Sequence, residues 1–333
     1  MNQNFVSLAL LGLLATGAGF HSTPAHASAA AYRISDRMVL GEKTKWDYVA
    51  IDDVRHRLFV TRGDRVDVVD LTSGKLMASI TNTDGVHGVA FAEELKLGFT
   101  SNGKSNSVTV FDLDTLATTI EIPLTGKNPD AILYEPGVKK LYVFNGSSND
   151  VDIIDAAKLK AVGNVKATGR PEFAVSDGHG RIYFNIEDNA GINVIDVASN
   201  QRIAAWKLDG CEEPTGLAID VARGRLFSAC RNGIMAVTNA LTGQRVTQFA
   251  IGEHPDATVY DAASGTLLTS GGGGNGTLAI AHQDDADHYS VRASIATEKG
   301  ARTMAIDANT KTVYLPTVAS EKFVVLVATP EQH

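Results

Sequence analysis

Several ionisable and aromatic side chains of this sequence could bind a ligand, and they occur at matching places along the chain. Each lies three to five residues before one of seven landmarks, which recur at intervals of 40 to 47 residues. The landmarks are Ile51, Phe91, Leu133, Val175, Ile219, Val259 and Ile306. The candidates are Trp46, Asp47, His87, Asp130, Arg170, Glu172, His254, Asp256 and Arg302. Groups of these types can bind an anion, hold a metal ion or move a proton.

The chemistry of these side chains leaves three uses open. The two arginines and two histidines could bind a small anionic molecule, with the carboxylates orienting the basic groups. Alternatively, His87 and His254 with Asp256 or Asp130 could ligate a divalent metal, and a histidine beside a carboxylate could act as a general base. The groups could also satisfy only one another and the backbone around a wet channel. No spacing decides between these uses, because the ligands would come from different repeats.

The residues around each landmark predict the elements that position the candidates. In the first repeat, short strands are expected at 48–51, 58–61, 66–70 and 75–80, separated by turns rich in Gly, Asp and Ser. A unit of about 40–45 residues built from short strands is typical of a β-propeller. The sequence therefore predicts an all-β fold, a seven-bladed β-propeller with four-stranded antiparallel blades.

Two features of the repeats predict how the ring is built. The last repeat shows only three strands, whereas a strand at 32–40 precedes the first repeat without partners. We expect this N-terminal strand to close the last blade and to cover its exposed edge. The aspartates that end the third strands are expected to hydrogen-bond the following turns. They are Asp70, Asp112, Asp155 and Asp196.

The antiparallel order of the strands predicts where the candidates lie. The segment that enters each inner strand shares a face with the loop between the second and third strands. We therefore expect the candidates to converge around one mouth of the central channel. Two other segments are not expected to bind a ligand. The glycine run at 271–276 lacks the lysine and the helix of a phosphate loop, and the acidic segment 284–288 is predicted to be a solvated hairpin turn on the opposite face.

The second strands carry a resemblance to a known family. The segments 58–61, 97–102, 141–145 and 182–185, together with 300–307, resemble the YVTN-repeat β-propellers of exported bacterial proteins, the YncE-like group. The resemblance spans residues 32–327. It implies the propeller fold, and it implies no single reaction and no required cofactor, so a divalent metal stays open.

The beginning of the chain predicts export. Residues 5–20 form an uncharged apolar run, and Ala25, His26 and Ala27 match the small-residue pattern of a signal-peptide cleavage site. We expect a signal peptide at 1–27, cleaved near Ala27, and a single propeller domain at 28–333. The mature protein should be periplasmic or secreted and should have no membrane span.

Charge and cysteine content narrow the function further. The net charge of −8 argues against general nucleic-acid binding. Cys211 and Cys230 could form a disulfide in an oxidising compartment, remain buried thiols, or have a metal-binding or redox role. Two functions are therefore considered. The first is a monomeric binding or interaction module for a small anionic ligand or a protein partner. The alternative is an enzyme of lactonase or lyase type that uses the same ring of residues.

Overall fold

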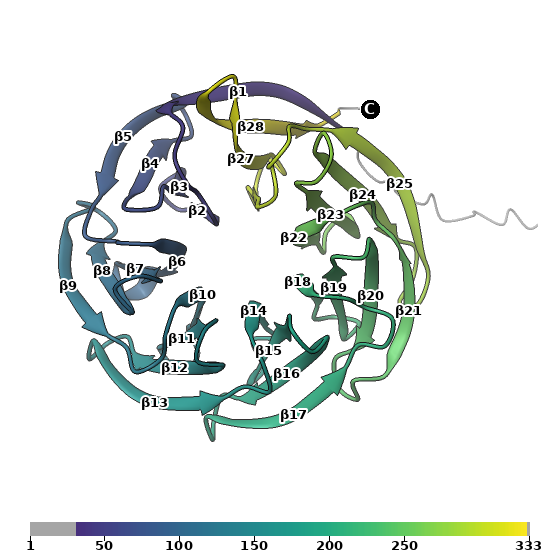
Figure 1. Ribbon diagram of the computed structural model, residues 1–333, viewed down its shortest axis with the longest axis horizontal. Helices are drawn as coiled ribbons and strands as arrows, with labels where there is room; N and C mark the ends of the chain where they lie inside the picture. Colours follow the sequence, from purple (N-terminus) through teal and green to yellow (C-terminus); the bar gives the residue numbers. More distant parts are fainter. Residues whose placement is uncertain (1–30, 332–333) are drawn as a thin grey trace, which may run out of the picture.

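The computed structural model describes residues 31–331, and these residues form a ring of seven four-stranded antiparallel sheets (Figure 1). Each sheet is a blade that runs from the central axis to the rim, and in six of the seven blades the first strand lies nearest the axis and the last strand lies at the rim. The predicted seven-bladed β-propeller is confirmed. The predicted signal peptide at 1–27 lies outside the described residues.

Six blades follow one another along the chain, each with its strands in sequence order. Blade 1 comprises β2 (Val49–Asp52), β3 (Arg57–Thr61), β4 (Val66–Asp70) and β5 (Lys75–Ile80). Blade 2 comprises β6 (Val86–Ala92), the short 3-10 helix η1 (Glu93–Leu95), β7 (Leu97–Asn102), β8 (Ser107–Asp112) and β9 (Thr118–Pro123). Blade 3 comprises β10 (Pro129–Glu135), β11 (Lys140–Asn145), β12 (Asp150–Asp155) and β13 (Lys160–Lys166).

The next three blades have the same plan. Blade 4 comprises β14 (Pro171–Ser176), β15 (Arg181–Ile186), β16 (Gly191–Asp196) and β17 (Gln201–Lys207). Blade 5 comprises β18 (Pro214–Asp220), β19 (Arg225–Cys230), β20 (Ile234–Asn239) and β21 (Arg245–Ala250). Blade 6 comprises β22 (Pro255–Asp261), β23 (Thr266–Gly271), β24 (Thr277–Gln283) and β25 (Tyr289–Ala296).

Blade 7 joins the two ends of the chain. Its inner strands are β26 (Ala305–Ile306), β27 (Val313–Ala319) and β28 (Lys322–Pro330), and its outer strand is β1 (Tyr32–Glu42). β1 pairs antiparallel with β28, from Tyr32 opposite Pro330 to Glu42 opposite Lys322. The predicted closure of the ring by the N-terminal strand is therefore confirmed.

A buried arginine fastens this closure. The side chain of Arg62, after β3, is almost inaccessible to solvent and forms an ion pair with the equally buried Asp67 at 2.8 Å. It also donates hydrogen bonds to the backbone carbonyls of Leu40 and Glu42 at the end of β1. Its guanidinium carbon lies 3.9 Å from the centre of the Phe323 ring, in a cation–π contact. One side chain thus ties blade 1 to both β1 and β28 of blade 7.

The core lies between neighbouring blades. Strands alternate their side chains between two faces, and both faces of an interior blade contact another blade. Phe144 of blade 3 packs against Phe184 of blade 4, for example, with ring centres 5.1 Å apart. Both rings are fully buried. This packing between seven blades holds the inner strands in fixed positions around the channel.

The aspartates at the ends of the third strands have the predicted structural role. Asp70 accepts a hydrogen bond from the backbone N–H of Ser73, and Asp112 accepts one from that of Thr115. Asp155 and Asp196 accept the equivalent bonds from Lys158 and Ser199. The hypothesis that these acids cap turns is confirmed.

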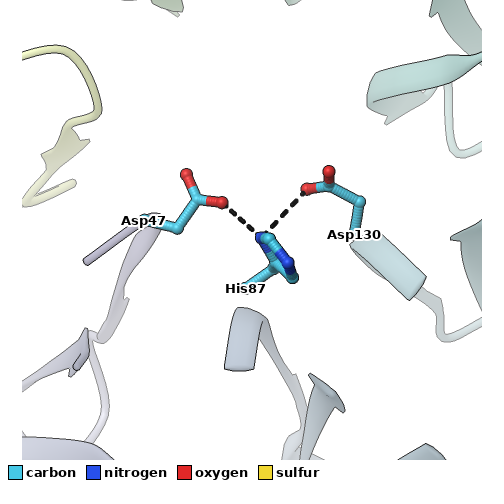
Figure 2. Close-up of side chains that lie close together, drawn as sticks. All are labelled: Asp47, His87 and Asp130. Carbon is cyan, nitrogen blue, oxygen red and sulfur yellow. Dashed lines mark hydrogen bonds and ion pairs between the residues drawn. The ribbon is translucent and has the colours of Figure 1, made fainter. Parts of the chain in front are cut away.

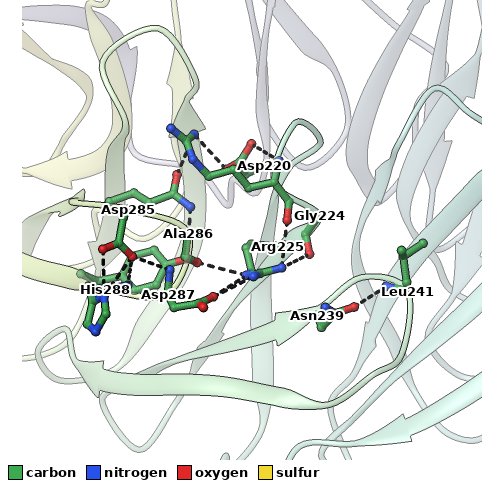
Figure 3. Close-up of polar contacts among 12 residues, drawn as sticks. Asp220, Gly224, Arg225, Asn239, Leu241, Asp285, Ala286, Asp287 and His288 are labelled. Carbon is green, nitrogen blue, oxygen red and sulfur yellow. Dashed lines mark hydrogen bonds and ion pairs between the residues drawn. The ribbon is translucent and has the colours of Figure 1, made fainter.

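The acidic turn between β24 and β25 is also structural, although it is more than a solvated hairpin (Figure 3). Arg225 of blade 5 donates hydrogen bonds to the carbonyl of Ala286 and to the carboxylate of Asp287. Asp285 accepts hydrogen bonds from the backbone N–H groups of Asp287 and His288. Asp287 therefore helps to fasten blade 6 to blade 5, whereas Asp285 holds the shape of its own turn.

Candidate functional site

A repeated irregularity positions the candidate side chains. In β6, β10, β14, β18 and β22, one extra residue interrupts the pairing with the second strand near the mouth. In β6, for example, Val86 pairs with Asn102 but the next pair is Val89 with Thr100. Such a bulge turns a side chain away from its regular direction. His87, Asp130, Glu172 and Asp256 all lie within these interruptions.

Three candidates from three neighbouring blades meet in one cluster (Figure 2). Asp47 precedes β2, His87 lies in β6 and Asp130 lies in β10. Nδ1 of His87 is 2.5 Å from a carboxylate oxygen of Asp47 and 3.7 Å from one of Asp130. One ligand atom from each residue lies within 4.8 Å of the other two. Among residues 31–331, this is the one group of three such side chains close enough to share a metal ion.

The cluster changes the proton affinity of its members. Burial disfavours the charged imidazole of His87, but the hydrogen bond to Asp47 and the charges of Asp130 and Asp47 outweigh burial, so the pKa of His87 is raised. Burial raises the pKa of Asp130 to about 6, against the opposing effect of His87. A cation in the cluster would favour the charged carboxylates and would replace the proton that His87 shares with them.

Arg302 and Asp256 extend the cluster toward blades 6 and 7. The guanidinium group of Arg302 lies 3.4 Å from Asp47 and 3.8 Å from Asp256. It also donates a hydrogen bond to the carbonyl of Trp46. Burial raises the pKa of Asp256 to about 6, although the charge of Arg302 lowers it. Arg302 therefore compensates two carboxylates only loosely, because both contacts are long.

Arg170 and Glu172 form a second charged group at the same mouth. Arg170 lies 3.3 Å from Glu172 and 2.9 Å from Glu187, which follows β15. Burial and the charges of Asp130 and Glu187 raise the pKa of Glu172 to about 9, despite Arg170. Glu187 is not among the sequence candidates. It lies in a loop between second and third strands, which the sequence places on this face.

Tyr48 is a further mouth residue outside the candidates. Its side chain is partly buried and packs edge-on against Phe173, with ring centres 4.7 Å apart. Burial and the charge of Asp130 raise its pKa well above the usual value, so it stays protonated. Together with Ala131 and other apolar residues, these rings line a cavity of about 120 Å³. The channel beside the charged cluster is therefore partly apolar.

The structure does not bring His254 into the cluster. Its backbone has a positive φ of 48°, and its side chain is exposed. Its ring lies against Gly273, where an added Cβ would approach it to 2.6 Å. The set His87, His254 and Asp256 suggested by the sequence is therefore replaced by Asp47, His87 and Asp130 as the group with metal-binding spacing.

A cavity of about 780 Å³ opens beside the cluster. Asp47, His87 and Arg302 belong both to its wall and to the channel mouth. Trp46 forms another part of the wall and packs edge-on against Phe323, with ring centres 5.8 Å apart. Its indole N–H has no hydrogen-bond partner among the described residues. Most of the remaining wall comes from blades 1 and 2.

Cys211 and Cys230 are joined by a disulfide in the structure. Both residues are buried, and their Cα atoms lie 5.3 Å apart. The bond links the segment before β18 to the end of β19, on the mouth side of blade 5. It supports the inner strand at a point where the strand pairing is interrupted.

Comparison with known proteins agrees with this architecture. No family model matches the sequence. A stretch of 126 residues is 28% identical to antigen Lp49 of Leptospira interrogans serovar copenhageni, and it covers 36% of this chain and 28% of that protein. The chain therefore matches less than a third of the length of this relative.

Two solved structures share the fold. A structure of U3-55K has a TM-score of 0.76 and 9% sequence identity, and the match covers 89% of this chain and 98% of that chain. The WD40 repeats of RRP9 also give a TM-score of 0.76, with 8% identity over 90% of this chain and 98% of that chain. The protein is thus a seven-bladed β-propeller. Its resemblance to the YncE-like group stays a prediction.

Proposed function

We propose that this chain is an exported β-propeller binding protein that holds a divalent cation between Asp47, His87 and Asp130. The observation that carries the proposal is the convergence of these three side chains from three blades. An imidazole nitrogen with two carboxylate oxygens is a donor set that suits Zn²⁺ or Mn²⁺. Three protein ligands leave coordination positions open, so a ligand in the neighbouring cavity could reach the ion.

The charge of the mouth supports a cation. Asp47, Asp130 and Asp256 surround His87 and Arg302, and the two basic groups do not fully compensate them. Burial raises the pKa of Asp130 and of Asp256 to about 6, which is the response of carboxyls that lack a sufficient positive partner. A divalent ion would supply the missing charge at the centre of the cluster.

Protons should compete with this ion. Metal ligands must be deprotonated, and both His87 and Asp130 have raised pKa values. We therefore expect the cation affinity to increase as the pH rises from about 5 to 8, with protons released on binding. Without the ion, a protonated His87 lies between the carboxylates of Asp47 and Asp130, and its charge stabilises the cluster.

The candidate signal peptide at 1–27 and the disulfide support the proposal that the protein is exported. A disulfide such as Cys211–Cys230 persists in oxidising compartments, and the sequence carries a candidate signal peptide. No helix within residues 31–331 is long and apolar enough to cross a membrane. Among the described residues, no observation favours the lactonase or lyase alternative over binding.

Titration calorimetry of the purified protein tests the cation site. The protein is first stripped with EDTA, dialysed, and titrated with ZnCl₂ and MnCl₂ at pH 7.5 or above. We expect one site per chain, lost in His87→Ala and strongly weakened in Asp130→Asn. His254→Ala is the matched control, because His254 lies on the same face but outside the cluster, and it should bind like the unmodified protein. Equal loss in all three variants, or no binding to the unmodified protein, would refute the proposal.

A further inference from the structure

We infer that the cavity beside the cation site binds a small organic polyacid, a molecule with two or more carboxylate groups. One carboxylate would occupy an open position of the cation, and the others would contact the basic side chains of the cavity wall. This inference rests on the proposed cation site and names the class of its ligand. Three observations carry it, namely the size of the cavity, the charge of its wall and its continuity with the cluster.

The size of the cavity fits a small molecule. Its volume of about 780 Å³ lies within the roughly 300–1,000 Å³ typical of ligand sites. Glycines at Gly63, Gly85 and Gly300 form part of its wall, and all three have positive φ. At Gly85 an added Cβ would come within 2.7 Å of Lys104. The glycines therefore let the backbone of the wall approach neighbouring wall residues such as Lys104 closely.

The wall is mainly basic, in contrast to the acidic cluster next to it. Lys45, Arg65, Lys104 and Arg302 all line the cavity, and they come from segments of blades 1, 2 and 7. Arg65 already pairs with the exposed Asp64 at 3.3 Å and with the buried Asp67 at 2.9 Å. Lys104 pairs with Asp84 at 2.9 Å. Arg302, whose contacts with carboxylates are 3.4 Å or longer, and Lys45, which forms no ion pair within residues 31–331, are therefore the basic groups that a ligand would engage most directly. Cations spread over several loops match a ligand with several separated acidic groups better than a single oxyanion.

The cavity adjoins the cluster, so that its basic wall lies directly beside the acidic side chains. Arg302 lines the cavity and contacts Asp47 of the cluster at 3.4 Å. Once a cation neutralises Asp47 and Asp130, Arg302 loses part of its partner charge and can pair with a carboxylate of the ligand. Cation and polyacid should therefore each strengthen the binding of the other.

Tryptophan fluorescence can report on the occupant of the cavity. The chain contains two tryptophans. Trp46 lines the cavity, whereas Trp206 lies in the rim strand β17 of blade 4. In a Trp206→Phe background, Trp46 is the single reporter. We would titrate this protein with succinate and tricarballylate, and with neutral succinamide as the matched control. Each titration is done with metal-free protein and with Zn²⁺-loaded protein from which free zinc has been removed.

Two variants test the basic wall. In the Zn²⁺-loaded protein, Arg302→Gln and Lys45→Gln should each weaken tricarballylate binding about tenfold, the usual effect of losing one charge-assisted contact. Lys127→Gln is the control, because Lys127 is an exposed lysine in the segment that enters β10 and does not line the cavity. We expect tricarballylate to bind more tightly than succinate, and succinamide to leave Trp46 emission unchanged.

The outcomes separate this inference from the proposed cation site. If calorimetry shows one zinc site but no acid changes Trp46 emission, the polyacid inference is wrong and the cation site stands. If the acids bind equally well with and without zinc, the bridging role of the cation is wrong. If succinamide binds as well as succinate, or if Lys127→Gln weakens binding as much as Arg302→Gln, the charge of this wall does not select the ligand and the inference fails.

Discussion

Replacement of Asp130 by asparagine should stabilise the metal-free protein at pH 8. Asp130 is a buried carboxyl among other acids, and its pKa is raised to about 6. In the unfolded chain its pKa returns to about 3.9. Between these two values the folded state keeps a proton that the unfolded chain releases. The contribution of Asp130 to the free energy of unfolding therefore falls as the pH rises through this range, and this contribution is lost completely above about pH 6.

The expected stabilisation by Asp130→Asn can be worked out from the pKa shift of Asp130. A difference of about two pKa units corresponds to roughly 3 kcal/mol of unfolding free energy at pH 8. An asparagine at this position would keep a side chain of similar shape and an oxygen that accepts hydrogen bonds, but it carries no charge. It would also relieve Glu172, whose pKa Asp130 helps to raise. In a domain of this size, the gain corresponds to a melting temperature higher by roughly 5 °C.

Calorimetric melting at a series of pH values measures this gain. Unmodified protein and Asp130→Asn, both treated with EDTA, should melt alike near pH 4 and diverge as the pH rises. Asp64→Asn is the control, because the side chain of Asp64 is 73% exposed and its replacement should not change the profile. At pH 8, added Zn²⁺ should stabilise the unmodified protein far more than Asp130→Asn. A variant that melts below the unmodified protein at pH 8 without metal would refute this reasoning.

The remaining predictions concern the closure of the ring and the disulfide. Arg62→Met should destabilise the protein by about 1–3 kcal/mol, because the carbonyls of Leu40 and Glu42 lose their donor and Asp67 keeps only Arg65 as an ion-pair partner. Denaturant unfolding measures this loss, and a change within error would contradict the role of Arg62 in fastening blade 1 to blade 7. Deletion of residues 31–41 should lower the melting temperature by several degrees, since it removes the strand that covers β28, and an unchanged melting curve would be inconsistent with closure by β1. Replacement of both cysteines by serine should lower the free energy of unfolding by on the order of 3 kcal/mol, because the disulfide closes a loop over a sequence separation of 19. Equal stability of the oxidised and reduced protein would show that the bond contributes nothing.

Most of the fold could be predicted because its signals are local and repeated. Strands at 66–70 and 75–80 begin and end where the alternation and the turns place them, as β4 and β5 show. The closure by β1 followed from counting strands, since an unpaired strand at each end of a chain has one natural partner. The turn-capping aspartates followed from residue type alone, because Asp accepts hydrogen bonds from the backbone two or three residues ahead.

The composition of the site was harder to predict because it depends on backbone detail. The repeats align His87, Asp130 and His254 at similar distances from their landmarks, but in the structure only His87 and Asp130 lie in the cluster with Asp47. A bulge in β6 and another in β10 turn His87 and Asp130 toward Asp47. At His254 a positive φ turns the chain before β22, and the imidazole lies exposed against Gly273. A bulge has no fixed sequence signature. The positive φ before a proline, which recurs at Asn128, Glu213 and His254, is likewise not indicated by the proline that follows.

The position of the candidate site implies that ring closure would affect the proposed binding as well as stability. Asp47 lies in the segment that joins β1 to β2, and Arg302 precedes β26 in blade 7. These two residues contact each other across the seam where the ends of the chain meet. Arg62 holds the carbonyls of Leu40 and Glu42 at the same seam. The residues that close the propeller therefore also hold Arg302 close to Asp47, and loosening of the seam is expected to separate Arg302 from the proposed cation cluster before the ring unfolds.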